Sequence, residues 1–222
     1  NLQYIFQSEN YKTIRILEKK MEFLTKKNLS EKIYDTIYNT EKYLFILSPY
    51  IQLDDYFKNE VFKTHINNSS VHIIIGFGKN ENNVRRSFRK DDIEYFMQFP
   101  NITIVYIPNL HAKYYGNEKK AIITSMNLID YSFKNNIEFG VYTEKTLITQ
   151  FSTNNFFDST YTTCMNIVEE DGYTIYIKRP KYKKKLFLLK DYVGSEVELN
   201  LVDDLIKFGK VDKRNLSEFW EE

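Results

Sequence analysis

Polar residues between positions 111 and 138 are of types that together could handle a phosphodiester. His111 and Lys113 stand two residues apart, so in an extended segment both side chains face the same side. A neutral imidazole can attack phosphorus, and a neighbouring ammonium group favours an anion beside it. The spacing therefore predicts a nucleophile and an anion-binding cation in one pocket.

The next polar residues supply the other parts of such a site. Ser125 and Asn127, again two apart, offer a hydroxyl and an amide as donors to phosphoryl oxygens. Glu138, on the next expected strand, could accept from the second ring nitrogen of a histidine and hold its tautomer. Each pair alone is common at structural positions, but the ordered combination indicates phosphodiester hydrolysis.

The ordered set resembles the signature of the phospholipase D superfamily, which is His-x-Lys, a later Asp, Gly-Ser-x-Asn and a further Asn-x-Glu. The resemblance covers roughly residues 30–145. It implies a phospholipase-D-like α/β fold, a mixed β-sheet flanked by helices. The site residues that it implies are catalytic His111, Lys113, Asn127 and Glu138, substrate-binding Ser125, and supporting Glu118 and Asn136.

Two positions depart from the superfamily pattern. Glu118 stands where the family has Asp, which keeps a carboxylate on a longer side chain, and Thr124 replaces the Gly before Ser125. The Cβ of Thr124 could crowd a phosphate cradle. We expect activity to survive the change at Glu118, whereas crowding at Thr124 would lower it.

The chain carries one copy of a motif that the superfamily's mechanism, as the resemblance implies it, uses twice. One histidine forms a phosphohistidine, and the other protonates the leaving oxygen and later activates water. His65 and His72 are not followed by Lys two residues on, so we expect both to be structural. A homodimer with a two-fold axis would place His111 and Lys113 of both subunits around one cleft. No metal or other cofactor is implied.

The overall charge gives no argument for a polyanion partner, because 31 Lys and Arg stand against 30 Asp and Glu. The charge is nevertheless segregated. Residues 171–190 hold seven basic and one acidic side chain, and residues 191–222 hold four basic and nine acidic. A solvated face is the ordinary interpretation of such runs. Beside a phosphodiester site, two basic clusters could instead contact the nucleic-acid backbone: Arg85, Arg86 and Arg89 in one, Lys183 and Lys184 in the other.

The elements that must position these residues follow an α/β order. Apolar runs and their flanking residues predict a helix capped by Ser30, strands over 43–48, 71–75 and 102–107, and helices over 54–62 and 91–99. Further on we expect a hairpin of 111–115 and 119–124 turning at Gly116-Asn117, strands over 137–142, 173–178 and 186–189, and helices within 147–168 and over 202–208. A composition shift divides a catalytic domain, 1–170, from a small C-terminal β/α extension, 171–222. The extension could serve recognition, dimerisation or the catalytic domain itself.

The composition restricts where such a protein works. The single cysteine, Cys164, excludes an internal disulfide framework and suits a reducing compartment. No apolar run is long enough for a membrane-spanning helix, so we expect a cytoplasmic protein without membrane contact.

The function that we expect is a metal-independent endonuclease that cleaves DNA through a phosphohistidine at a dimer-shared site. Small single-motif chains resemble the superfamily's bacterial nucleases, which include a metal-independent restriction endonuclease with a dimeric catalytic domain. Two alternatives stay open. One is a lipid phosphodiesterase, and the other is a catalytically decayed fold that binds nucleic acid or a partner protein.

Overall fold

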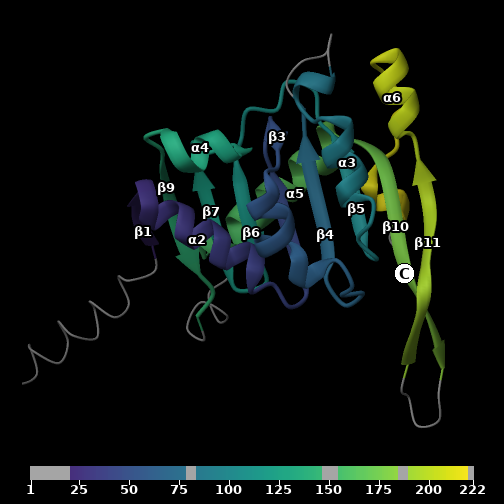
Figure 1. The fold of residues 1–222 in the computed structure, drawn as a ribbon, viewed down its shortest axis with the longest axis horizontal. Coiled ribbons are helices and arrows are strands. Elements are labelled where there is room, and N and C mark those ends of the chain that lie inside the picture. The colour runs from purple at the N-terminus through teal and green to yellow at the C-terminus, as the bar shows by residue number, and fades with distance from the viewer. Residues whose placement is uncertain (1–20, 79–83, 147–154, 185–189, 220–222) are drawn as a thin grey trace, which may run out of the picture.

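The computed structural model describes residues 21–78, 84–146, 155–184 and 190–219, and they form one large mixed sheet flanked by helices (Figure 1). Its strand order is β1-β9-β7-β6-β2-β4-β5-β10-β11. In chain order these strands are β1 Met21–Thr25, β2 Tyr43–Leu47, β4 His72–Phe77, β5 Ile102–Tyr106, β6 Tyr114–Asn117, β7 Lys120–Thr124, β9 Phe139–Glu144, β10 Tyr173–Lys184 and β11 Lys190–Asn200. The mixed α/β architecture confirms the predicted fold class.

The helices lie on the two faces of the sheet. Helix α2 (Lys26–Tyr38) packs on one face and α5 (Phe156–Asp171) on the other (Figure 1). Shorter elements complete the described part: the strand pair β3 (Ile51–Gln52) and β8 (Leu128–Ile129), α3 (Lys90–Phe96), α4 (Asp130–Asn135), α6 (Val202–Phe208), a π-helical turn Phe57–Val61, and 3-10 turns Lys63–His65, Val84–Arg86 and Leu216–Phe219.

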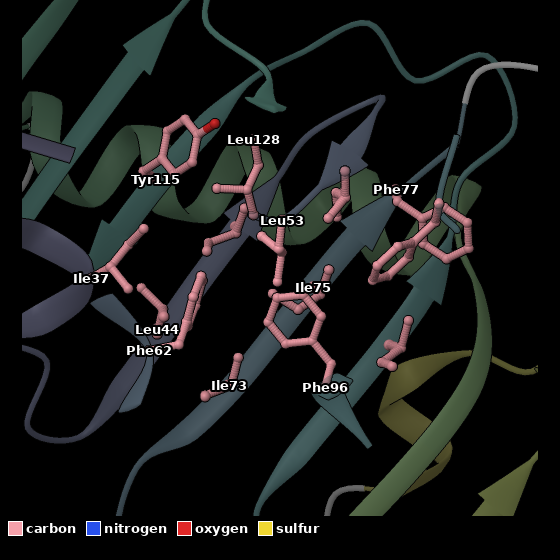
Figure 2. Close-up of a cluster of buried hydrophobic side chains, with 14 of the residues drawn as sticks. Ile37, Leu44, Leu53, Phe62, Ile73, Ile75, Phe77, Phe96, Tyr115 and Leu128 are labelled. Carbon is pink, nitrogen blue, oxygen red and sulfur yellow. The ribbon is translucent and has the colours of Figure 1, made fainter. Parts of the chain in front are cut away.

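Because helices cover both faces of the sheet, the central strands are unbroken apolar runs. Leu44 and Ile46 of β2 lie in the cluster on the α2 side, which Figure 2 shows, whereas Phe45 and Leu47 lie in the cluster on the α5 side. Because both sets of side chains are buried, β2 needs no polar alternation. β2, β4 and β5 pair in parallel, as their order with intervening helical segments predicted.

Several predicted element boundaries are wrong. Ser30 does not cap α2: the helix begins one turn earlier, at Lys26, because Leu29 already packs in the core, and the Ser30 hydroxyl donates to the Lys26 carbonyl at 3.4 Å. The hairpin turns at Glu118-Lys119, because Gly116 still pairs with Ala121. Asn117 Oδ1 closes this turn by accepting from the amides of Lys119 and Lys120, both at 2.8 Å.

The strands also differ in extent from the prediction. The strand expected from residue 137 begins at Phe139, and His111 to Lys113 precede β6 rather than belonging to it. β10 runs on to Lys184 and pairs with the unexpected strand β11, while β1 pairs with β9 at the opposite side of the sheet. The strand predicted over 186–189 and the first part of the helix predicted over 147–168 fall outside the described residues. β10 also pairs with β5, so the segment after residue 170 continues the sheet.

Candidate functional site

The segments that carry His111, Ser125 and Glu138 lie at one edge of the sheet because of the directions of four strands. Leu47, at the end of β2, pairs with Tyr114 at the start of the antiparallel β6. The end of β7 lies beside the start of β9, where Thr124 pairs with Gly140. One edge of the sheet, here called the catalytic edge, therefore carries the segments just outside these strand ends: 111–113, 125–127 and 136–138.

A carboxylate with both oxygens held lies at this edge. Glu138 is only 8% exposed, its Oε2 accepts from the Ser125 hydroxyl, and its Oε1 accepts from Asn136 Nδ2 at 3.1 Å. The amide of Phe139 donates to Ser125 Oγ at 3.2 Å, so the hydroxyl is itself fixed. Hydrogen bonds to an ionised acceptor are shorter and stronger than neutral ones. Ser125 therefore positions Glu138 in this structure, and its contact to substrate stays a prediction.

The turn after β7 is closed by the residue that departs from the family pattern. Thr124 Oγ1 donates to the Phe139 carbonyl at 2.7 Å and accepts from the Met126 amide at 3.1 Å. Asn127 follows in the same turn, and its buried Oδ1 has no hydrogen-bond partner among the described residues. That oxygen can take a donor supplied from outside.

Two residues that the sequence analysis did not assign to the site, Ser48 and Tyr115, support the same turn through hydrogen bonds. Ser48 Oγ, just after β2, accepts from the Leu128 amide at 2.9 Å and donates to the Tyr50 carbonyl at 2.7 Å. Tyr115 donates its hydroxyl to the Met126 carbonyl at 3.0 Å, and burial raises its pKa well above the usual value. A hydroxyl at the end of a buried strand, such as Ser48, is the signal that could have identified this support.

His111 is exposed at the catalytic edge, and Lys113 is half-buried beside β7, where its carbonyl accepts from the Thr124 amide at 3.1 Å. Glu118 is not brought to them. It lies at the other end of β6, and its carboxylate accepts from the Lys42 amide at 3.1 Å and the Glu41 amide at 3.3 Å. This residue ties the β6–β7 turn to the segment between α2 and β2.

The first basic cluster precedes α3, after the end of β4 at the catalytic edge. Arg89 Nε lies 3.2 Å from Asp92 Oδ2, and Lys58 Nζ lies 2.8 Å from Oδ1 of the same fully buried carboxylate. Arg89 thus anchors α3, while Arg86 is exposed. The side chain of Arg85 lies outside what the structure describes.

The second basic cluster lies away from the catalytic edge within one chain. β10 is antiparallel to β5: Tyr173 pairs with Tyr106 at the end of β5, and Lys178 pairs with Ile102 at its start. Lys183 and Lys184 therefore extend beyond the opposite edge, in the β10–β11 hairpin that projects from the sheet in Figure 1. Within a single chain the two basic clusters therefore lie at opposite edges of the sheet, because the direction of β10 separates them.

The two other histidines have structural contacts, as predicted. His65 Nε2 lies 2.7 Å from the Ile37 carbonyl, to which it donates. His72 Nε2 accepts from Arg179 Nη1 at 3.1 Å. Burial, assisted by the Arg179 charge, lowers the pKa of His72 to about 3, so its ring is neutral in the folded protein.

The described residues do not include a group of three or more His, Cys, Asp or Glu side chains placed to hold a metal ion. None of the helices in the described ranges is long and apolar enough to cross a membrane.

Comparison with known proteins shows the family to which the chain belongs. A family model described as "Cardiolipin synthase, PLD-like domain" matches residues 33–159, more than half of the chain. The chain belongs to the phospholipase D superfamily. This superfamily comprises phosphodiesterases, and the match spans the whole segment from α2 to the start of α5 that builds the catalytic edge.

Two solved structures share the fold at low identity. NucT from Helicobacter pylori is 14% identical with a TM-score of 0.53, over 70% of this chain and 99% of that one. Nuc, a phospholipase D family member from Salmonella typhimurium, is 12% identical with a TM-score of 0.50, over 70% and 98%. A comparison with curated protein sequences finds no match.

Proposed function

We propose that the protein is an endonuclease that cleaves DNA through a phosphohistidine on His111. The observation that carries this proposal is the buried Glu138 carboxylate, held by two donors at the edge where His111 and Lys113 lie. A carboxylate fixed at this edge can orient a histidine ring, which favours an active enzyme over a decayed fold. The exposed Arg86, at the same edge, adds positive charge for a polyanion.

The proposed reaction has two displacements. The imidazole of His111 attacks phosphorus, the P–O bond to the leaving group breaks, and the departing oxygen takes a proton from His111 of the partner subunit. That second imidazole then removes a proton from water as the water oxygen attacks phosphorus and the P–N bond breaks. Lys113 and Asn127 donate to the non-bridging oxygens, and Glu138 accepts from a histidine ring N–H.

We propose that two copies of the chain supply the two histidines. An apolar surface beside the catalytic edge supports this: Phe23 is 67% exposed, Phe139 56% and Ile123 41%. Phe23 and Ile123 are both opposite Val141, so they share one face of the sheet, and Phe139 lies two residues away on the same strand. An exposed apolar patch commonly marks an interface, and a two-fold axis beside it would bring two catalytic edges together.

Mixing active and inactive subunits tests this function. Wild-type protein should cleave plasmid in excess EDTA, and His111→Ala protein should not. When the two are unfolded together in equal amounts and refolded, random pairing makes about one quarter of the dimers fully wild type. A dimer-shared site therefore leaves about one quarter of the wild-type activity, because a dimer with any inactive subunit lacks one of the two histidines. Independent sites would leave about one half. Lys119→Ala, in the turn at the other edge, serves as the matched control and should retain full activity in the same mixture.

Other outcomes would overturn the proposal. Release of a headgroup from phospholipid vesicles without DNA cleavage would identify a lipid phosphodiesterase, and salt-sensitive DNA binding without cleavage would identify a binding module. We also propose a cytoplasmic location, where the buried free thiol of Cys164 would stay reduced.

A further inference from the structure

A pocket of about 650 Å³ opens where α6 meets the sheet, at the end of β5 and the start of β10. Three aromatic rings line it, Tyr106 from β5, Tyr173 from β10 and Phe208 from α6. Among the described residues that line the pocket, Lys210 carries the charge. Aromatic surface next to a cation suits a ligand that combines a flat ring with an anionic group.

The pocket opens at the catalytic edge. Tyr106 ends β5, and Pro108, which also lines the pocket, stands three residues before His111 in the chain. In the sheet, β2 and β4 separate β6 from β5, which amounts to three strand spacings, or about 14 Å. Figure 1 shows α6 at the same end of the molecule as α4 and β3. A strand of nucleic acid with its phosphodiester at His111 could therefore reach α6.

Phe208 is held in place although its ring is exposed. The side chains of Val202 and Leu205 are buried and anchor α6 to the rest of the protein. Gly209, with φ 72°, follows the helix, and its amide donates to the Leu205 carbonyl at 2.8 Å. Phe208, the last residue of α6, is nevertheless 59% exposed. An anchored helix that presents a large apolar ring at a pocket provides a preformed stacking surface.

We propose that this pocket binds a nucleobase of the substrate, which stacks on Phe208 while Lys210 contacts an adjacent phosphate. The inference rests on the proposed nuclease function and extends it. The substrate strand runs from His111 across the ends of β2 and β4 to α6. Bases in a duplex are stacked on one another and cannot enter a pocket, so the preferred substrate is single-stranded or locally unpaired DNA. Lys207 does not line the pocket, but its Nζ lies 4.9 Å from the Phe208 ring centroid, so a second cation is close to the stacking ring.

Equilibrium binding to a fluorescent ten-nucleotide oligothymidylate, measured by polarisation in the His111→Ala background, tests the pocket. Adding Phe208→Ala should weaken binding about 5- to 150-fold, the range found when a stacking aromatic is removed. Phe208→Trp should restore it. Tyr38→Ala removes another exposed aromatic ring, at the end of α2, and should leave binding unchanged. Lys210→Ala should reduce the salt dependence of binding by about one counterion.

Activity of otherwise wild-type enzyme separates this inference from the proposed function. Phe208→Ala should raise KM for the oligonucleotide but leave hydrolysis of bis(p-nitrophenyl) phosphate unchanged, because that small diester cannot span the roughly 14 Å between β6, beside His111, and β5, where the pocket opens. Unchanged oligonucleotide binding, or an equal loss on both substrates, would overturn the pocket while leaving the nuclease function intact. Wild-type protein that neither binds nor cleaves the oligonucleotide would overturn both. Tighter binding to duplex than to single strands would also refute the pocket.

Discussion

Phe139→Ala should dissociate the proposed homodimer without unfolding either subunit. Phe139 follows Glu138 directly, and its ring stacks on Phe23 with the centroids 5.7 Å apart. In one chain 56% of Phe139 is exposed. An aromatic side chain presents 150–250 Å², so roughly 100 Å² of each Phe139 is available to an interface. At about 25 cal/mol per Å², its burial contributes roughly 2.5 kcal/mol.

An isologous interface would contain Phe139 twice, so the substitution removes up to about 5 kcal/mol, a weakening of the dimer by several thousandfold. The variant subunit should still fold, because the truncated ring lies on the surface of the single chain. Sedimentation velocity across a concentration series measures the dissociation constant directly. Specific activity should fall together with the dimer fraction on dilution, at far higher concentrations for Phe139→Ala than for wild type.

The matched control is Tyr192→Ala, which removes an exposed aromatic ring from β11, at the opposite side of the sheet. It should leave both the dissociation constant and the activity unchanged. A Phe139→Ala protein with a wild-type dissociation constant would refute the proposed interface. A monomer with full specific activity would refute the shared site itself, because one chain supplies one copy of the motif.

Three further substitutions probe the frame around the site by urea denaturation. Asp92→Ala should lower the free energy of unfolding by about 3 kcal/mol, because the partly buried ammonium group of Lys58 loses its buried carboxylate partner. His72 has a folded-state pKa of about 3, whereas an unfolded histidine titrates near 6.5. The unfolded chain therefore binds more protons between these values, and stability falls as the pH drops through them, by about 3 kcal/mol at pH 4. His72→Gln should remove that difference between pH 7 and pH 4. Ser48→Ala should cost about 1–3 kcal/mol, since the Leu128 amide loses its acceptor, and should lower kcat more than it changes KM.

The parallel centre of the sheet could be predicted because its signals are local. Each of β2, β4 and β5 is a short apolar run, and helical segments separate them. Buried strands of this kind belong to parallel sheets with both faces covered, which fixes their relative direction. The ordered polar motif predicted that His111, Glu138 and their neighbours form one site, and in the structure these residues lie just outside strand ends that share one edge.

The predictions that were wrong concern features set by contacts between distant segments. Ser30 has the residue type of a cap, but the burial of Leu29 starts α2 one turn earlier. The direction of β10 follows from its pairing with β5, some seventy residues upstream, and no local pattern records it. The charge of Lys183 and Lys184 was visible in the sequence, whereas the edge of the sheet on which they lie was not.

Thr124 shows how a departure from a family pattern can be read once the structure is known. Glycine at this position leaves room for a phosphate cradle, and a Cβ there predicted crowding. In the structure the hydroxyl of Thr124 joins the Phe139 carbonyl to the Met126 amide, so it closes the turn that bears Ser125 and Asn127. The added side chain therefore supplies hydrogen bonds that hold the two segments in register, a function that glycine cannot perform. The Thr124 side chain fills space that glycine would leave open, and the same side chain makes the hydrogen bonds that close the turn. Residue type alone could not show which of these two effects the structure uses.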